Sequence, residues 1–73
     1  MAIEKVTLPV ARKIANLTQK GLASAVGVSE STVINWEKGR SEPTVIQAQK
    51  ISELVGIPLD CIIFLSSNAV KPQ

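Results

Sequence analysis

The sequence contains no histidine, no tyrosine and a single cysteine. Without histidine or a second cysteine, the chain can assemble neither a disulfide framework nor a zinc cluster from its own residues. Its carboxylates are not clustered either, so no catalytic constellation is visible. We therefore expect no metal site, no cofactor and no enzymatic activity.

Long apolar runs are also missing, although 45% of the residues are hydrophobic. Nothing approaches the roughly 20 apolar residues that a membrane-spanning helix needs. The N-terminus lacks the pattern of a secretory signal peptide. From these absences we expect a soluble cytoplasmic protein with no membrane partner.

Charge is weak but unevenly distributed. The net charge is only +2, which by itself does not indicate a nucleic-acid partner. Residues 1–40 carry six Lys or Arg against three Glu, a balance of +3, whereas residues 41–73 carry two Lys against three Asp or Glu, a balance of −1. The 73 residues suit one domain,. The N-terminal half of this domain carries the excess of positive charge.

Apolar residues recur at helical spacing in five short segments. The first expected helix is capped by Thr7 and ends near Asn16, and the second is capped by Thr18 and ends at Gly27. The third runs from Ser29 to Gly39. The fourth runs from near Pro43 to Gly56, and the fifth from Pro58 to about Phe64. No strand pattern competes with these helices. The sequence predicts a compact all-α domain over residues 1–65, followed by a flexible tail over residues 66–73.

The apolar spacing of the first and fourth helices indicates which side of each is buried. In the first helix, Ile14 and Ala15 both continue the apolar spacing. In the fourth, Val45 begins a stripe that continues through Ala48, Ile51 and Val55. We expect these stripes to face the core.

The second and third helices are separated by a very short connection. Gly27 is a good residue for a helix C-terminus, and Ser29 is a good N-cap. Only Val28 stands between them. This arrangement is typical of two helices that meet at a tight turn.

The third helix is poor in apolar residues. Val33 and Trp36 form one narrow stripe, while residues 30–32 and Asn35 are polar. If this is the second helix of a helix-turn-helix, its N-terminal side chains enter the major groove and read base edges. The alternative is a capped helix whose polar face is simply solvated. Composition and spacing alone leave both interpretations open.

Residues 17–43, "LTQKGLASAVGVSESTVINWEKGRSEP", resemble the phage repressor and Cro-like helix-turn-helix family, also called the XRE family. The residues that carry this resemblance are Thr18, Gln19, Leu22, Ala23, Gly27, Val28, Ser29, Trp36, Glu37, Gly39 and Pro43. The segment "ISELVGIPLDCIIFL" is similar to the ending common among prophage and Gram-positive members. The resemblance implies a lambda-repressor-like domain of five helices from about Thr7 to Leu65.

The resemblance also implies which residues read bases. Glu30, Ser31 and Asn35 occupy the reading positions, and Thr32 lies beside them. The Asn35 amide can bond adenine through two hydrogen bonds, and a carboxylate can accept from cytosine N4. Glu30 has a second explanation, because negative charge at a helix N-terminus is favourable without DNA. Under either explanation Glu30 weakens non-specific binding, because it repels phosphates.

Phosphate contacts are implied on both sides of the reading positions. Gln19 matches a glutamine that contacts a phosphate and braces the recognition helix. Lys38 and Arg40 are placed for phosphates, and backbone amides near Thr44 can hold another. Lys20 is a further candidate, with an ordinary solvated lysine as the alternative.

Two charged residues have a structural role in the family. The resemblance implies that Arg12 and Glu37 form a mostly buried ion pair between the first helix and the recognition helix. The alternative is that Arg12 reaches a phosphate. The spacing of Trp36 from Val33 fits packing in the core better than stacking on bases.

These observations predict a sequence-specific double-stranded DNA-binding transcriptional regulator of the repressor or Cro type. One reading helix contacts only a few base pairs, so we expect a homodimer on a palindromic operator. The dimer-interface candidates are Ile62, Ile63, Phe64 and Leu65. The alternative is a protein-interaction module on the same fold, such as an antitoxin, an antirepressor or a coactivator-like adaptor.

Overall fold

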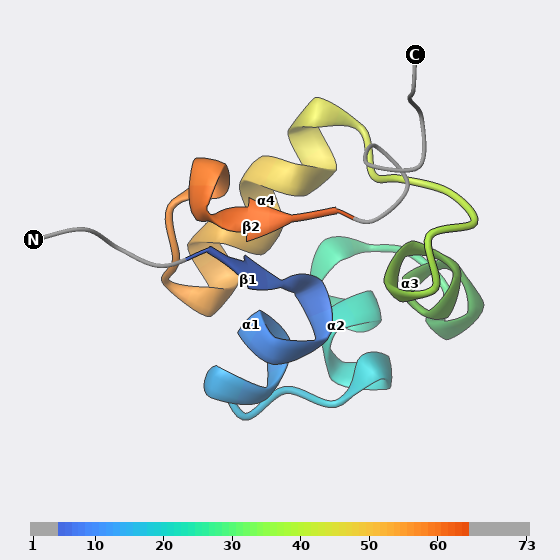
Figure 1. Ribbon diagram of the computed structural model, residues 1–73. Coiled ribbons are helices and arrows are strands. Elements are labelled where there is room, and N and C mark those ends of the chain that lie inside the picture. The colour runs from blue at the N-terminus through green and yellow to red at the C-terminus, as the bar shows by residue number, and fades with distance from the viewer. Residues whose placement is uncertain (1–4, 65–73) are drawn as a thin grey trace, which may run out of the picture.

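A computed structural model describes residues 5–64 of the chain (Figure 1). The elements follow in the order β1 (Val6–Thr7), α1 (Leu8–Ile14), α2 (Gln19–Val26), α3 (Glu30–Glu37), α4 (Val45–Val55), the 3-10 helix η1 (Leu59–Cys61) and β2 (Ile62–Ile63). The fold is therefore mostly helical. Leu65, which we proposed for a dimer interface, and the tail 66–73 lie outside the described residues.

The N-terminal ends of three helices are set by short polar side chains. The Thr18 side chain accepts a hydrogen bond from the backbone N–H of Gly21, and Ser29 accepts one from Thr32. At α4, Thr44 and Gln47 form a reciprocal capping box. Each bond satisfies an N–H that has no partner inside its helix. Gln47 was missed in the sequence, although a threonine followed three residues later by glutamine is a helix-start pattern.

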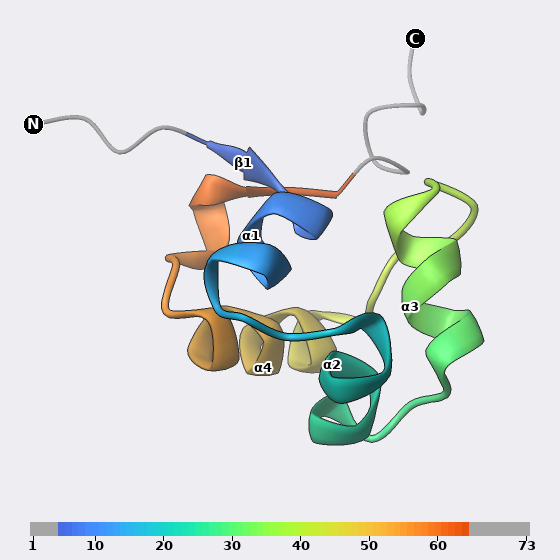
Figure 2. The same cartoon turned by 90° about the horizontal axis from the view of Figure 1, so that it is seen from below.

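One core lies between the helices and the small sheet. In the view of Figure 2, α1, α2 and α4 surround it and α3 stands at one side. Helix α2 contacts both α3 and α4, while α1 contacts α3, α4 and both strands. The core consists of Leu8, Ala11, Leu22, Ala23, Val26, Val33, Trp36, Ile51, Val55 and Ile62. Trp36 is thus a core residue, with 3% of its surface exposed.

The prediction of a fifth α-helix was wrong. Residues 59–61 form one turn of 3-10 helix, after which Ile62 and Ile63 are extended and pair in parallel with Val6 and Thr7. Branched side chains at these positions favour extended backbone. Because the pairing joins positions more than fifty residues apart, no local pattern could reveal it. In the described chain, the predicted five-helix all-α fold is corrected to four α-helices, one 3-10 turn and a minor strand pair.

Two side chains expected in the core lie on the surface. Ile14 is 60% exposed, and Ala15 packs on the core in its place. Val45 is 71% exposed, so the buried stripe of α4 begins only at Ala48. Both residues stand at the end of a helix, where a helical pattern continues in the sequence but the neighbouring elements no longer cover it.

Candidate nucleic-acid interface

Helices α2 and α3 form a hairpin around Gly27. Gly27 adopts the left-handed conformation with φ of 92°, and its N–H donates to the carbonyl of Ala23 at 2.8 Å. The N–H of Val28 donates to the same carbonyl at 2.9 Å. A residue with a Cβ atom is disfavoured at this φ, whereas glycine adopts it freely. This turn lets Ser29 begin α3 two residues later.

Helix α3 buries one narrow side. Val33 is fully buried and Trp36 is nearly so. Glu30 and Ser31 are exposed, and Asn35 is half-buried. Since Ser31 and Asn35 are four residues apart in a helix, they lie on the same face, one turn from each other. The helix therefore presents a polar face away from the core.

Thr32 differs from the other three residues predicted to read bases. Its hydroxyl lies 2.9 Å from the Ser29 hydroxyl, and its N–H donates to the same Ser29 oxygen at 3.2 Å. Thr32 therefore takes part in capping α3. Within the part of the chain that the structure describes, the side chains of Glu30, Ser31 and Asn35 have no hydrogen-bond or ion-pair partner. Their polar groups are available to a ligand.

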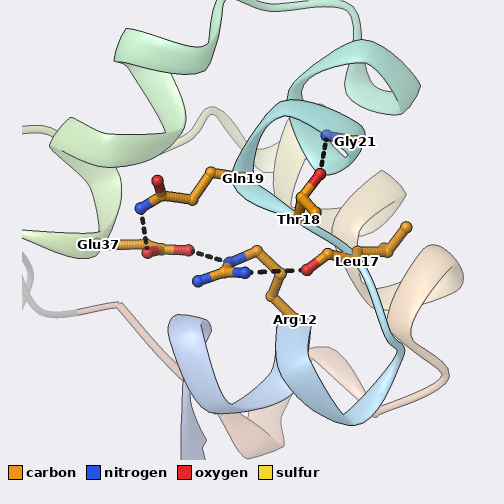
Figure 3. Close-up of polar contacts among 6 residues, drawn as sticks. All are labelled: Arg12, Leu17, Thr18, Gln19, Gly21 and Glu37. Atoms are coloured by element: carbon orange, nitrogen blue, oxygen red, sulfur yellow. Dashed lines mark hydrogen bonds and ion pairs between the residues drawn. The ribbon is translucent and has the colours of Figure 1, made fainter.

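A polar network holds α3 against the rest of the domain (Figure 3). The Arg12 Nε atom donates to Glu37 Oε2 at 2.7 Å, and the Gln19 amide donates to Glu37 Oε1 at 2.9 Å. A second Arg12 nitrogen donates to the carbonyl of Leu17 at 2.9 Å. The Arg12 and Glu37 side chains are only 11% and 7% exposed. The network thus joins α1, the α1–α2 loop, α2 and the C-terminal end of α3.

These contacts place Arg12 and Gln19 against Glu37, in the arrangement that the family resemblance implies. Arg12 points toward Glu37 rather than outward, as its sticks in Figure 3 show. Gln19 contacts Glu37 from the first residue of α2, so its amide braces α3. No spacing rule links Gln19 with Glu37, because the two residues belong to different helices that meet only after folding.

The basic residues predicted to contact phosphates lie within this helix pair or directly after it in the chain. Lys20 is exposed in the first turn of α2, Lys38 is exposed at the C-terminus of α3, and Arg40 is exposed two residues later. Among the described residues, none of the three forms an ion pair. Their charges therefore remain available to an anionic partner.

Thr44 is placed at the start of α4, but its own N–H is already engaged. It donates to the Gln47 side chain at 2.9 Å, and the N–H of Gln47 donates back to the Thr44 hydroxyl at 3.1 Å. In this arrangement the N–H groups of Val45 and Ile46 remain free to donate hydrogen bonds to an anion at the start of α4.

The predicted dimer-interface residues separate into different environments. Ile62 is buried, with 6% of its surface exposed, and closes the core through β2. Ile63 is half-buried, and Phe64 is half-buried against the core. Ile62 therefore contributes to the stability of one copy rather than to a surface.

Other kinds of site are not found in the described chain. Residues 5–64 contain no group of three or more histidine, cysteine, aspartate or glutamate side chains placed to hold a metal ion. Within the same residues, no helix combines the length and apolar character needed to cross a membrane.

Two helices joined by a glycine turn, with the second exposing a polar face that has no partner among residues 5–64, define a helix-turn-helix protein,. The family model described as helix-turn-helix matches residues 10–60. This chain belongs to that helix-turn-helix family, of the XRE type. The matched range contains α2, α3 and all of the Arg12–Glu37–Gln19 network.

Two curated relatives support the same family. An uncharacterized HTH-type transcriptional regulator of Methanocaldococcus jannaschii is 40% identical over 57 residues, which cover 78% of this chain and 86% of the relative. Another, from Methanothermobacter thermautotrophicus, is 47% identical over 61 residues, which cover 82% of this chain and 88% of the relative. No solved structure is matched by the chain.

Proposed function

We propose that the protein is a sequence-specific transcriptional regulator of the repressor or Cro type. It reads a palindromic operator through the major groove as a homodimer and acts in the cytoplasm. Membership of a family of DNA-binding transcriptional regulators supports the general function. The observation that carries the finer proposal is the polar face of α3, where Glu30, Ser31 and Asn35 lack partners in the described chain.

The chemistry of this face suits base edges. Ser31 and Asn35 offer a hydroxyl and an amide one turn apart, and Glu30 offers an acceptor at the N-terminal end of the helix. Such groups match the donors and acceptors of the major groove. Exposed Lys20, Lys38 and Arg40 supply positive charge on α2 and in the segment that follows α3. In this proposal they contact phosphates and orient α3, and the polar face supplies the selectivity.

The proposal is tested by selecting bound duplexes from a random-sequence pool at about 0.15 M salt, near the physiological value. We expect enrichment of a palindrome with half-sites about one helical turn apart. If the folded protein enriches no sequence, the specific regulator is excluded. A protein-interaction module on the same fold then becomes the better explanation.

Asn35→Ala tests base reading. We expect it to weaken binding to the preferred duplex by about 1–3 kcal/mol and to relax selectivity at one base position. The loss follows because the adenine edge is left without its two hydrogen bonds. Binding is measured by titration on the preferred duplex and on its single-base variants. Gln49→Ala, which removes an exposed amide from α4, is the control and should change neither affinity nor selectivity.

Lys38→Ala tests phosphate contact. We expect weaker binding to all sequences by a similar factor and a salt dependence that is shallower by about one unit of slope. Titrations at several salt concentrations measure this slope. Lys13→Ala removes an exposed lysine from α1, outside the helix pair, and should leave the slope unchanged. If Asn35→Ala and Lys38→Ala act alike across sequences, this division of roles is wrong.

A further inference from the structure

One apolar residue of α3 is not explained by the core. Ile34 is half-buried. Among residues 5–64, it belongs neither to the core cluster nor to the partly buried apolar residues that pack on that cluster. Its neighbour Val33 is fully buried, and Trp36 is nearly so. These two residues make the core contacts of α3, and the core does not account for Ile34.

The geometry of the helix places Ile34 on the outer face. Successive residues of an α-helix are turned by about 100° around its axis. Ile34 is therefore turned by about 130° from the midpoint of Val33 and Trp36. Asn35 is turned equally far in the other direction, and Ser31 lies between the two, one turn earlier. In Figure 2, α1, α2 and α4 all lie on one side of α3, so none of them covers the opposite face.

The residues around Ile34 on this face are polar or charged. Glu30 lies one turn before it,. Lys38 lies one turn after it, and the N–H of Lys38 donates to the Ile34 carbonyl at 3.0 Å. Asn35 adjoins it in the chain. In the proposed function all three neighbours face DNA, so Ile34 places an apolar group in the middle of a polar reading surface.

The major groove offers an apolar group that fits such a side chain. This group is the C5-methyl of thymine. Asparagine selects adenine through two hydrogen bonds, and the thymine paired with that adenine presents its methyl in the same groove. Consecutive Cα atoms are about 3.8 Å apart, and successive base pairs are about 3.4 Å apart. Ile34 and Asn35 therefore reach the same base pair or adjacent ones.

We propose that Ile34 is a specificity-determining residue that packs against the C5-methyl group of a thymine, in the base pair that Asn35 contacts or in the next one. This inference rests on the proposed function and adds an apolar contact to its polar reading face. The contact removes apolar surface of both groups from water. It neutralises no phosphate, so it adds selectivity without changing the salt dependence of binding.

Replacing thymine with uracil isolates the methyl group. Uracil keeps the O4 acceptor and the pairing with adenine, and lacks the C5-methyl. The probe is the duplex selected by the wild-type protein, with uracil at one thymine at a time. We expect one thymine, within one base pair of the position that Asn35→Ala relaxes, at which uracil lowers the affinity of the wild type about fourfold, the effect of one buried methyl group.

Ile34→Ala and Ile14→Ala provide the matched variants. Both replace isoleucine with the residue of highest helix propensity and change no charge. Ile14 is 60% exposed on α1, outside the helix pair. We expect Ile34→Ala to bind the thymine and uracil duplexes within about twofold of each other, because the partner of the methyl group is removed. Ile14→Ala should keep the about fourfold difference.

Two further measurements separate this contact from other effects. The salt slope of Ile34→Ala should equal that of the wild type, because no phosphate contact is lost. Urea unfolding followed through Trp36 checks that the variants are folded. Ile34→Val, which removes a single carbon, is the second variant, and its difference between thymine and uracil should lie between those of Ile34→Ala and the wild type.

The inference is overturned if the wild type binds uracil as well as thymine at every position of the half-sites, or if Ile34→Ala and Ile34→Val keep the full difference. It is also overturned if the thymine lies further than one base pair from the position that Asn35→Ala relaxes. In each of these results a duplex has been selected, so the proposed regulator stands and only the thymine contact fails. If no duplex is enriched, the proposed function itself fails, and the contact is excluded with it.

Discussion

Arg12→Met is expected to lower the free energy of unfolding by about 3 kcal/mol. The substitution leaves the Glu37 carboxylate, whose side chain is 7% exposed, with only the Gln19 amide as a partner. A domain of this length has a stability of roughly 4–11 kcal/mol, so the loss is a large share of the total. Urea unfolding measures it, because Trp36 is the only tryptophan and is buried in the core.

The double variant Arg12→Met/Glu37→Met separates loss of the pair from isolation of one charge. We expect it to be within about 1 kcal/mol of the wild type, because replacing both partners of a buried ion pair with apolar residues is often neutral. Far-UV circular dichroism serves as a second probe of unfolding, since Trp36 adjoins position 37. If the double variant loses the sum of the two single losses, the ion pair does not couple α1 with α3.

Leu22→Ala is expected to cost about 3 kcal/mol of stability. Leu22 is fully buried in α2, within the core cluster that also contains Val33 and Trp36 of α3. Removing most of its side chain loses apolar burial and leaves a cavity that the surrounding residues fill only in part. Denaturant unfolding should show a lower midpoint with an unchanged slope.

Leu54→Ala is the matched control for this experiment. Leu54 is 40% exposed on α4, so less apolar surface is lost and water occupies the space. Alanine also has the highest helix propensity, and we expect a change below about 1 kcal/mol. Comparable losses at Leu22 and Leu54 would show that burial in this core does not determine stability.

Together these predictions describe how α3 is held in place for its proposed role. Val33 and Trp36 anchor its inner side, while Arg12 and Gln19 hold Glu37 at its C-terminal end. In the described chain, the outer polar residues of α3 take part in none of these stabilising contacts. Substitutions at the outer face should therefore change binding without unfolding the domain, whereas substitutions in the network should reduce stability first.

Several parts of the fold could be predicted because their causes are local. Thr18 and Ser29 cap helices through bonds that span three residues, and Gly27 supplies the turn between them. Ala11, Leu22 and Val33 follow the helical spacing that places them in the core,. The helix-turn-helix was visible in the sequence because every one of these signals lies within a few residues of the element that it determines.

The candidate site was only partly predictable. The polar face of α3 follows from the composition of the helix and its narrow apolar stripe. The engagement of Thr32 with Ser29, and of Thr44 with Gln47, was not anticipated. Both depend on side-chain conformations within a cap, where a threonine hydroxyl can serve the helix or a ligand.

By itself, the sequence determined the helices up to α4, the glycine turn and the family to which the chain belongs. Only the tertiary structure decided that residues 62–63 form a strand with residues 6–7, that Ile62 is buried, and that Val45 is exposed. Hydrogen bonds in a helix join residues that are close in the chain, so a local sequence pattern is enough to predict them. Strand pairing and burial depend on which distant segments meet, and a pattern read along one segment does not contain that information.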